Sequence, residues 1–354
     1  MKFGVFSLMQ WPEDRSQSDV YRNELAQLSE AEAQGYDGIW LAEHHFSRYG
    51  IGPAIHLTAA HLAARTERIR IGTAITILPF MHPIRIAEEV AVLDHLSGGR
   101  IDFGMGRGYQ RHEFDGFGVE IAKSHLIFKE QLEIIERAWT GERFAWDGEF
   151  FQFPEMQILP TPLQNPRPPL FVAALSNSTL EWAASAGYPV MSDQFSPGYR
   201  LAKMRALYQE HAEKAGVDTT GFELPMLRQV YVGESMAKAR EDAAPALLWY
   251  YRSLARVGSP GGISGELPEN YSTYNLFGED GIDPEGDPEG LLEFLFENCT
   301  VVGDAAYCRD KLAELQETCG LDSLIAWQNF GGLAQEATRA SQRRFIEDVA
   351  PAFG

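Results

Sequence analysis

The sequence places a carboxylate and two imidazoles in consecutive positions, Glu43, His44 and His45, directly after the apolar run 38–42. Imidazole exchanges protons near neutral pH, so this group at the end of a buried strand can do acid–base chemistry. Neighbouring side chains of an extended chain point to opposite faces, which separates His44 from the other two and argues against a shared metal ion. A histidine pair that only bonds backbone carbonyls explains the same residues equally well.

A second candidate site surrounds Arg107, which lies among Gly104, Gly106 and Gly108 directly after another apolar run. Glycines let backbone N–H groups approach a ligand closely and the guanidinium adds charged donors, so this loop can hold a phosphate. The spacing is not the dinucleotide fingerprint, and we do not expect the EFDGFG segment that follows to open a helix. A flexible turn with a solvated arginine is the alternative interpretation.

Hydroxyl groups gather at a third place, Ser176, Ser178 and Thr179, where a strand pattern changes to a helical one. The free N–H groups and the positive dipole at a helix start favour an anion. An ordinary helix N-cap uses the same residue types, so phosphate binding here depends on where the fold places this helix.

The three sites follow short apolar runs that alternate with long amphipathic ones, which is typical of repeated βα units. We expect strands at 3–8, 38–42, 69–78, 101–104, 170–174, 190–192, 227–232 and 324–327. Helices are expected at 20–34, 54–64, 84–96, 124–139, 179–186, 199–215, 237–257, 305–318 and 335–349. This alternation favours an α/β fold of the closed (β/α)₈ TIM-barrel type with insertions, in which residues after the strands form the active site.

Two segments interrupt the repeat in what we expect to be a single domain, 1–354. Segment 140–169 contains FAWDGEFFQF, which predicts a hairpin insertion with Asp147 and Gly148 at its turn. Segment 258–290 is rich in glycine, proline and acidic residues. A long loop of this kind inside a compact domain predicts a mobile lid over a functional site.

Composition limits the function classes. The chain has 354 residues and a formal net charge of −20, from 30 Lys and Arg against 50 Asp and Glu. We therefore expect neither nucleic acid nor a membrane surface as a partner. The three cysteines, Cys299, Cys308 and Cys319, form no C-x-x-C pair and predict reduced thiols. No secretory signal and no apolar run of ~20 residues is present, so we expect a soluble cytoplasmic protein.

Taken together and in this order, the motifs make the sequence resemble the bacterial luciferase-like flavin monooxygenases, most closely the catalytic α-subunit of bacterial luciferase. The similarity runs from MKFG through WLAEHHF, GTA…LP…HP, LD…GR…FG…RG, EF…FG, EWAA and WY to the last expected strand. Each motif alone is unspecific, whereas their occurrence in one order over nearly the whole chain is specific. The resemblance implies a (β/α)₈ enzyme that binds reduced FMN (FMNH₂), reacts it with O₂ to a C4a-hydroperoxyflavin and oxygenates a small organic substrate such as an aldehyde.

The resemblance also implies roles for individual residues. His44 is the implied catalytic imidazole, and Glu113 and Trp249 are candidates for contacts to the substrate or the lid. The implied cofactor-binding residues are Ala74 and Ile75 at a cis peptide beside the flavin ring, Gly106, Arg107 at the flavin phosphate, Leu175 through its backbone, and Ser176 and Thr179 at the helix start. Where bacterial luciferase has a reactive cysteine and tryptophans, this chain has Gly106, Gln194 and Phe195, so the resemblance does not extend to light emission or to a preference for long-chain aldehydes.

The resemblance also implies protein partners and leaves two alternative functions open. A separate flavin reductase is implied, because no nicotinamide site is evident in the sequence. Pairing through the helices at 54–64 and 84–96 is implied too, as a homodimer or a heterodimer. A deazaflavin-dependent dehydrogenase on the same barrel, and a non-catalytic flavin-binding or partner subunit, are the two alternatives.

Overall fold

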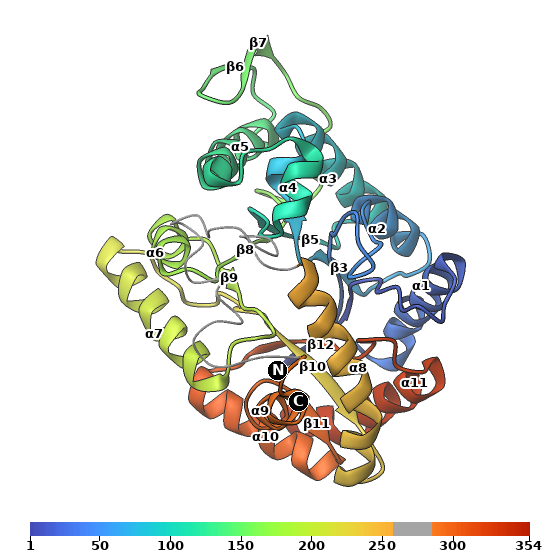
Figure 1. Ribbon diagram of the computed structural model, residues 1–354. Coiled ribbons are helices and arrows are strands. Elements are labelled where there is room, and N and C mark those ends of the chain that lie inside the picture. The colour runs from blue at the N-terminus through green and yellow to red at the C-terminus, as the bar shows by residue number, and fades with distance from the viewer. Residues whose placement is uncertain (258–284) are drawn as a thin grey trace.

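The fold is a parallel β-sheet that curls around one of its faces and carries helices on its outside (Figure 1). It is seen in a computed structural model that describes residues 1–257 and 285–354. In spatial order the sheet contains β11 (Val301–Gly303), β10 (Met226–Val232), β12 (Ser323–Trp327), β1 (Lys2–Ser7), β2 (Gly38–Leu41), β3 (Arg70–Thr73), β5 (Ile101–Gly106), β8 (Leu170–Ala173) and β9 (Val190–Met191), with β4 (Thr76–Ile77) paired to β5. The strands run parallel, so their C-terminal ends share one edge.

The sheet does not close into the predicted eight-stranded barrel within the described residues. The end of the sheet at β9 meets β10, the strand next to the other end, at one isolated parallel bridge between Ser192 after β9 and Met226 in β10. Strand β9 has only two residues, which is too short for a continuous ladder to β10. The structure therefore shows a mixed α/β fold with a curled parallel half-barrel. Each of the eight predicted strands has a counterpart, whereas β11 was not predicted.

The helices of the βα units cover the outer face of the sheet (Figure 1). They are α1 (Gln17–Gln34), α2 (Ile55–Ala63), α3 (Pro83–Ser97), α5 (Ser124–Trp139), α6 (Asn177–Ala186), α7 (Gly198–Ala215), α10 (Ala305–Cys319) and α11 (Gln335–Arg344). Helix α8 (Met236–Val257) packs instead against the inner cluster of the sheet, to which its Leu247 and Tyr250 belong. In α1, the Ser16 hydroxyl accepts from the N–H of Asp19, and Gly35 ends the helix with φ of 101°. No described helix is long and apolar enough to cross a membrane.

Alternation along the strands divides the core into two parts. Phe3 and Val5 of β1 face the helices, whereas Phe6 faces the inside of the curled sheet. The indole ring of Trp40 in β2 fills the space inside the curled sheet, next to the neighbouring strands. A Cβ on Gly72 would lie 2.3 Å from Cε3 of Trp40, so this strand position requires glycine. The inner cluster thus forms a packed floor beneath the C-terminal edge.

The structure confirms part of what the sequence predicted outside the βα repeat. Strands β6 (Phe144–Asp147) and β7 (Gln152–Met156) form the predicted hairpin. The prediction that EFDGFG opens no helix was wrong, because α4 (Arg111–Phe117) contains most of it and buries Glu113 and Phe114. Most of the predicted lid lies outside the described residues, and its end contains the start of α9 (Pro288–Asn298).

Candidate active site

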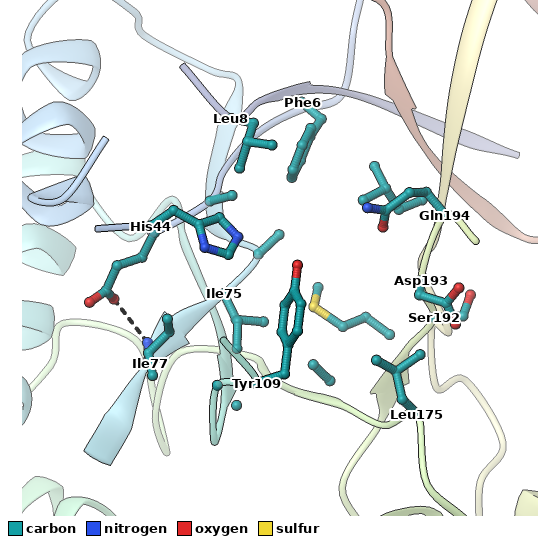
Figure 2. A pocket seen from close by; sticks show the side chains of 18 of the residues that line it. Phe6, Leu8, His44, Ile75, Ile77, Tyr109, Leu175, Ser192, Asp193 and Gln194 are labelled. Carbon is teal, nitrogen blue, oxygen red and sulfur yellow. Dashed lines mark hydrogen bonds between the residues drawn. The ribbon is translucent and has the colours of Figure 1, made fainter. Parts of the chain in front are cut away.

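A cavity opens at the C-terminal ends of the strands, on the inside of the curled sheet (Figure 2). Its apolar lining includes Phe6, Leu8, Ala74, Ile75, Met191 and Leu227, and its polar lining includes His44, Tyr49, Arg107, Tyr109, Asp193 and Gln194. The Ala74–Ile75 peptide bond in this wall is cis, as the resemblance implied. An apolar chamber with a few convergent polar groups is the usual form of a small-molecule site.

The His44 imidazole is held from one side and points into this cavity (Figure 2). Its Nδ1 lies 2.9 Å from Oε1 of Glu113, which is fully buried in α4. The ring of Tyr49 packs edge-on at 4.8 Å. A carboxylate beside Nδ1 requires the proton on that nitrogen, so in the neutral ring Nε2 presents a lone pair to the cavity. This is the geometry of an oriented general base or acid.

Glu43 and His45 form a separate pair. Oε1 of Glu43 lies 2.9 Å from Nε2 of His45, and its Oε2 accepts from the N–H of Ile77 at 2.9 Å. Figure 2 shows the second of these bonds, which joins the end of β2 to β4. His45 does not line the cavity within the described residues. The pair therefore fixes the strand ends on the side away from the His44 ring.

A second cavity adjoins the first and concentrates positive charge. Arg107 lines both cavities, and His125 and Lys129 of α5 line the second. No carboxylate is among the described residues that line it, in a chain whose net charge is −20. Burial, and then the nearby Arg107 charge, lower the pKa of His125. The second cavity is therefore suited to a phosphate.

The N-terminus of α6 forms another wall of the second cavity. Ser178 and Thr179 line it, whereas Ser176 is the N-cap and accepts from the N–H of Thr179 at 3.3 Å. Both interpretations of this segment thus apply together, because Ser176 caps the helix while the next residues face the cavity. A helix start beside cations adds to the attraction for an anion.

Some of the site residues proposed from the sequence line these cavities and others do not. Those that line one or both are His44, Ala74, Ile75, Gly106, Arg107, Leu175 and Thr179. Glu113 holds His44 from beneath instead of facing the cavity. Trp249 lines neither cavity within the described residues, and its indole N–H donates to Glu13 at 2.8 Å.

Sequence reasoning missed several polar residues of the site. Tyr49 and Tyr109 line the first cavity, and His125 and Lys129 line the second. Tyr109 could have been found, since it directly follows the glycine–arginine loop. The two residues of α5 lie one helical turn apart and carry no signal that identifies their partner in space.

Together these features define a class of protein: an α/β enzyme with its active site at the C-terminal edge of a parallel sheet. Comparison with known proteins gives the family. The chain belongs to the luciferase-like monooxygenases, whose family model matches residues 1–322. The family expected from the sequence is confirmed, and the protein is an enzyme of the flavin-dependent monooxygenase type.

Individual relatives cover the whole chain. The oxygenase component of a flavin-dependent trigonelline monooxygenase from Acinetobacter baylyi is 29% identical over 100% of this chain and 96% of its own. An alkanal monooxygenase alpha chain from the Kryptophanaron alfredi symbiont is 32% identical over 99% of this chain and 98% of its own. The crystal structure of monooxygenase RslO1 from Streptomyces bottropensis superposes with a TM-score of 0.84 at 26% identity, with 100% of each chain covered.

Proposed function

We propose that this chain is the oxygenase component of a two-component monooxygenase, which uses reduced FMN and O₂ to oxygenate a small organic substrate such as an aldehyde. One observation carries the proposal: Gly106 and Arg107 line both the apolar cavity with the His44 imidazole and the cation-lined cavity beside it. A single ligand with a flat apolar ring at one end and a phosphate at the other matches this pair of cavities.

The residues present fit FMN. Arg107, Lys129 and the hydroxyls of Ser178 and Thr179 would hold the phosphate, and Ile75 at the cis peptide would lie against the ring. When bound, the reduced flavin supplies the electrons that activate O₂ for transfer of one oxygen atom to the substrate. The apolar walls of the first cavity keep water away from that reaction.

His44 would act on protons at the boundary between flavin and substrate. Its Nε2 holds a proton or gives it up, while the Glu113 carboxylate at Nδ1 stabilises the charged ring. Glu113 is thus proposed as a positioning residue for His44. Glu43 and His45 would keep β4 and the adjoining cavity wall in place.

Two protein partners are part of the proposal, a flavin reductase and a second copy of the chain. A separate reductase would supply the reduced flavin, in line with the oxygenase component named in the Acinetobacter relative. Leu57 of α2 and Leu96 of α3 are 74% and 61% exposed, and they border an apolar groove between these helices. We propose that a second copy of the chain covers this groove in a cytoplasmic homodimer.

The test is a stopped-flow experiment. The anaerobic complex of the protein with reduced FMN is mixed with O₂, and flavin re-oxidation is followed by absorbance with and without added aldehydes and ketones. Two separable phases, with an oxygenated product when substrate is present, are expected. A single rapid phase identical to that of free flavin would contradict the proposal.

Two further measurements separate the proposed function from the two alternatives. A deazaflavin-dependent dehydrogenase would bind the reduced deazaflavin cofactor more tightly than reduced FMN and would turn over without O₂. A non-catalytic flavin-binding subunit would retain its full contribution to turnover after His44→Ala. Equilibrium titration with both reduced cofactors, followed by turnover of the His44→Ala variant, distinguishes these outcomes.

A further inference from the structure

Gln194 presents a polar group to the active-site cavity that the flavin chemistry proposed above does not use. The residue follows β9 and lines the first cavity, together with His44 (Figure 2). Its side chain is more than nine-tenths buried. Its Nε2 donates to the Tyr250 hydroxyl at 2.6 Å, whereas its Oε1 makes no hydrogen bond within the described part of the chain. Because Gln194 lines the cavity, its carboxamide oxygen can accept a hydrogen bond from a ligand donor that enters there.

A chain of hydroxyl groups fixes the orientation of this carboxamide. The Tyr250 hydroxyl lies 3.0 Å from that of Tyr49, which lies 3.2 Å from that of Tyr109. Burial raises the pKa of all three phenols well above the ordinary value, so they remain neutral. With Nε2 engaged by Tyr250, the carboxamide oxygen is the acceptor that remains for a ligand.

The loop that carries Gln194 is built to be rigid. The Asp193 carboxylate accepts from the N–H groups of Phe195 and Ser196 at 2.7 and 2.6 Å. The buried Arg228 guanidinium donates to the carbonyls of Asp193 and Ser196, both at 2.8 Å. The ring of Phe195 lies parallel to that of Tyr250. A side chain held on such a support has little rotational freedom left to lose when a ligand binds.

From these contacts we propose that Gln194 is the residue that orients the substrate, by accepting a hydrogen bond from a hydroxyl or N–H group of a compact substrate. The proposal rests on the proposed function, since it places the donor of the substrate in the cavity that His44 faces. Phe6 and Phe195 supply aromatic walls there, which suit a ring-shaped substrate. A site built around a hydrogen bond rejects an analogue that lacks the donor group.

The test uses two ketones of nearly equal shape, 4-hydroxyacetophenone and 4-methylacetophenone. Binding of each to the FMN-loaded protein is measured by calorimetry, without reductant, and is repeated on the FMN-free protein. The hydroxyl compound is expected to bind the FMN-loaded protein about tenfold more tightly. In Gln194→Leu this ratio should fall to about one while the affinity for the methyl compound is kept.

Two further variants complete the design. Tyr250→Phe keeps the ring and removes the orienting hydroxyl, so it should lower the ratio without weakening binding of the methyl compound. Gln209→Leu, on the exposed face of α7, should leave the ratio at its wild-type value. Equal binding of the two ketones by the wild type, a ratio that survives Gln194→Leu, or no binding of either ketone overturns the proposal. The binding experiment contains neither reduced flavin nor O₂. Its result therefore does not depend on whether the protein catalyses the oxygenase reaction.

Discussion

Glu113 and His44 lie 69 positions apart and meet at 2.9 Å, with the fully buried carboxylate beneath the ring that faces the cavity. The same oxygen also accepts from the N–H of His45 at 2.8 Å, so helix α4 holds the end of β2 by its backbone as well. The position of the proposed catalytic imidazole thus depends on a short helix that follows the glycine–arginine loop.

Replacing Glu113 by Gln should lower the oxygenation rate on the order of 10²-fold. The amide oxygen can still accept from Nδ1 of His44, but the negative charge that stabilises the imidazolium is lost. The rate is measured in single turnovers with reduced FMN. Because both residues act as one unit, the double variant Glu113→Gln with His44→Ala should be no slower than His44→Ala alone. Additive losses would show that Glu113 acts independently of His44.

The second cavity predicts which part of a flavin its cations recognise. Arg107→Ala should raise the Kd for FMN by roughly 10- to 100-fold, because it removes charge-assisted hydrogen bonds to the phosphate. The Kd for riboflavin, which has no phosphate, should change much less. Lys129→Ala should act in the same direction. Lys123→Ala is the control, since this lysine is exposed and paired with Glu120 at 2.7 Å. Equal weakening of FMN and riboflavin by Arg107→Ala would contradict the assignment of the phosphate to this cavity.

A buried carboxyl group on α1 predicts the pH dependence of stability. Burial raises the pKa of Glu24 from 4.5 to about 7, against hydrogen bonds from Ser7 and Asn329. The folded form holds this proton more tightly than the unfolded form, so the contribution to stability is fully present below pH 4.5 and is lost as the pH rises through 7. Glu24→Gln imitates the protonated state. Its free energy of unfolding relative to wild type should therefore rise by about 2–3 kcal/mol between pH 5 and pH 8.

Urea unfolding at the two pH values measures this difference. Glu67→Gln, at an exposed position, provides the matched control and should shift stability by the same small amount at both. A Glu24→Gln variant whose relative stability did not change with pH would show that Glu24 is charged throughout this range.

The packing around Trp40 predicts that a single methyl group added at Gly72 lowers the stability of the fold. The added Cβ of Gly72→Ala would lie 2.3 Å from Cε3 of Trp40, so the indole must move within a filled interior. We expect a loss of about 1–3 kcal/mol in the free energy of unfolding, measured in urea. Trp40→Phe should recover part of that loss when it is combined with Gly72→Ala. A stable single variant would mean that the indole shifts at little cost.

The strands were predictable because buried parallel strands are continuous apolar runs. The separation of His44 from Glu43 and His45 followed from the alternation of side chains, and the structure points the His44 ring into the cavity and pairs the other two with each other. Helix α4 was missed because its sequence contains glycine and charge. It depends on tertiary packing, in which the fully buried Phe114 contacts Phe80.

The buried face of α8 was readable from the sequence. Leu247, Tyr250 and Leu254 are spaced by three and four residues and are fully buried, which leaves Trp249 on another face. The tyrosine chain from Tyr250 to Tyr109 could not be predicted, because its members come from segments about 60 and 200 positions apart. Only folding brings such hydroxyls together.

The pairing of β1 with β12 has a consequence for how the molecule forms. Lys2 lies opposite Ser323 in that ladder, and β1 also pairs with β2. The first strand therefore has one edge without its partner until residues 323–327 have been synthesised. Such a long-range contact raises the contact order and slows folding. During translation this exposed edge is where a chaperone has the longest time to act.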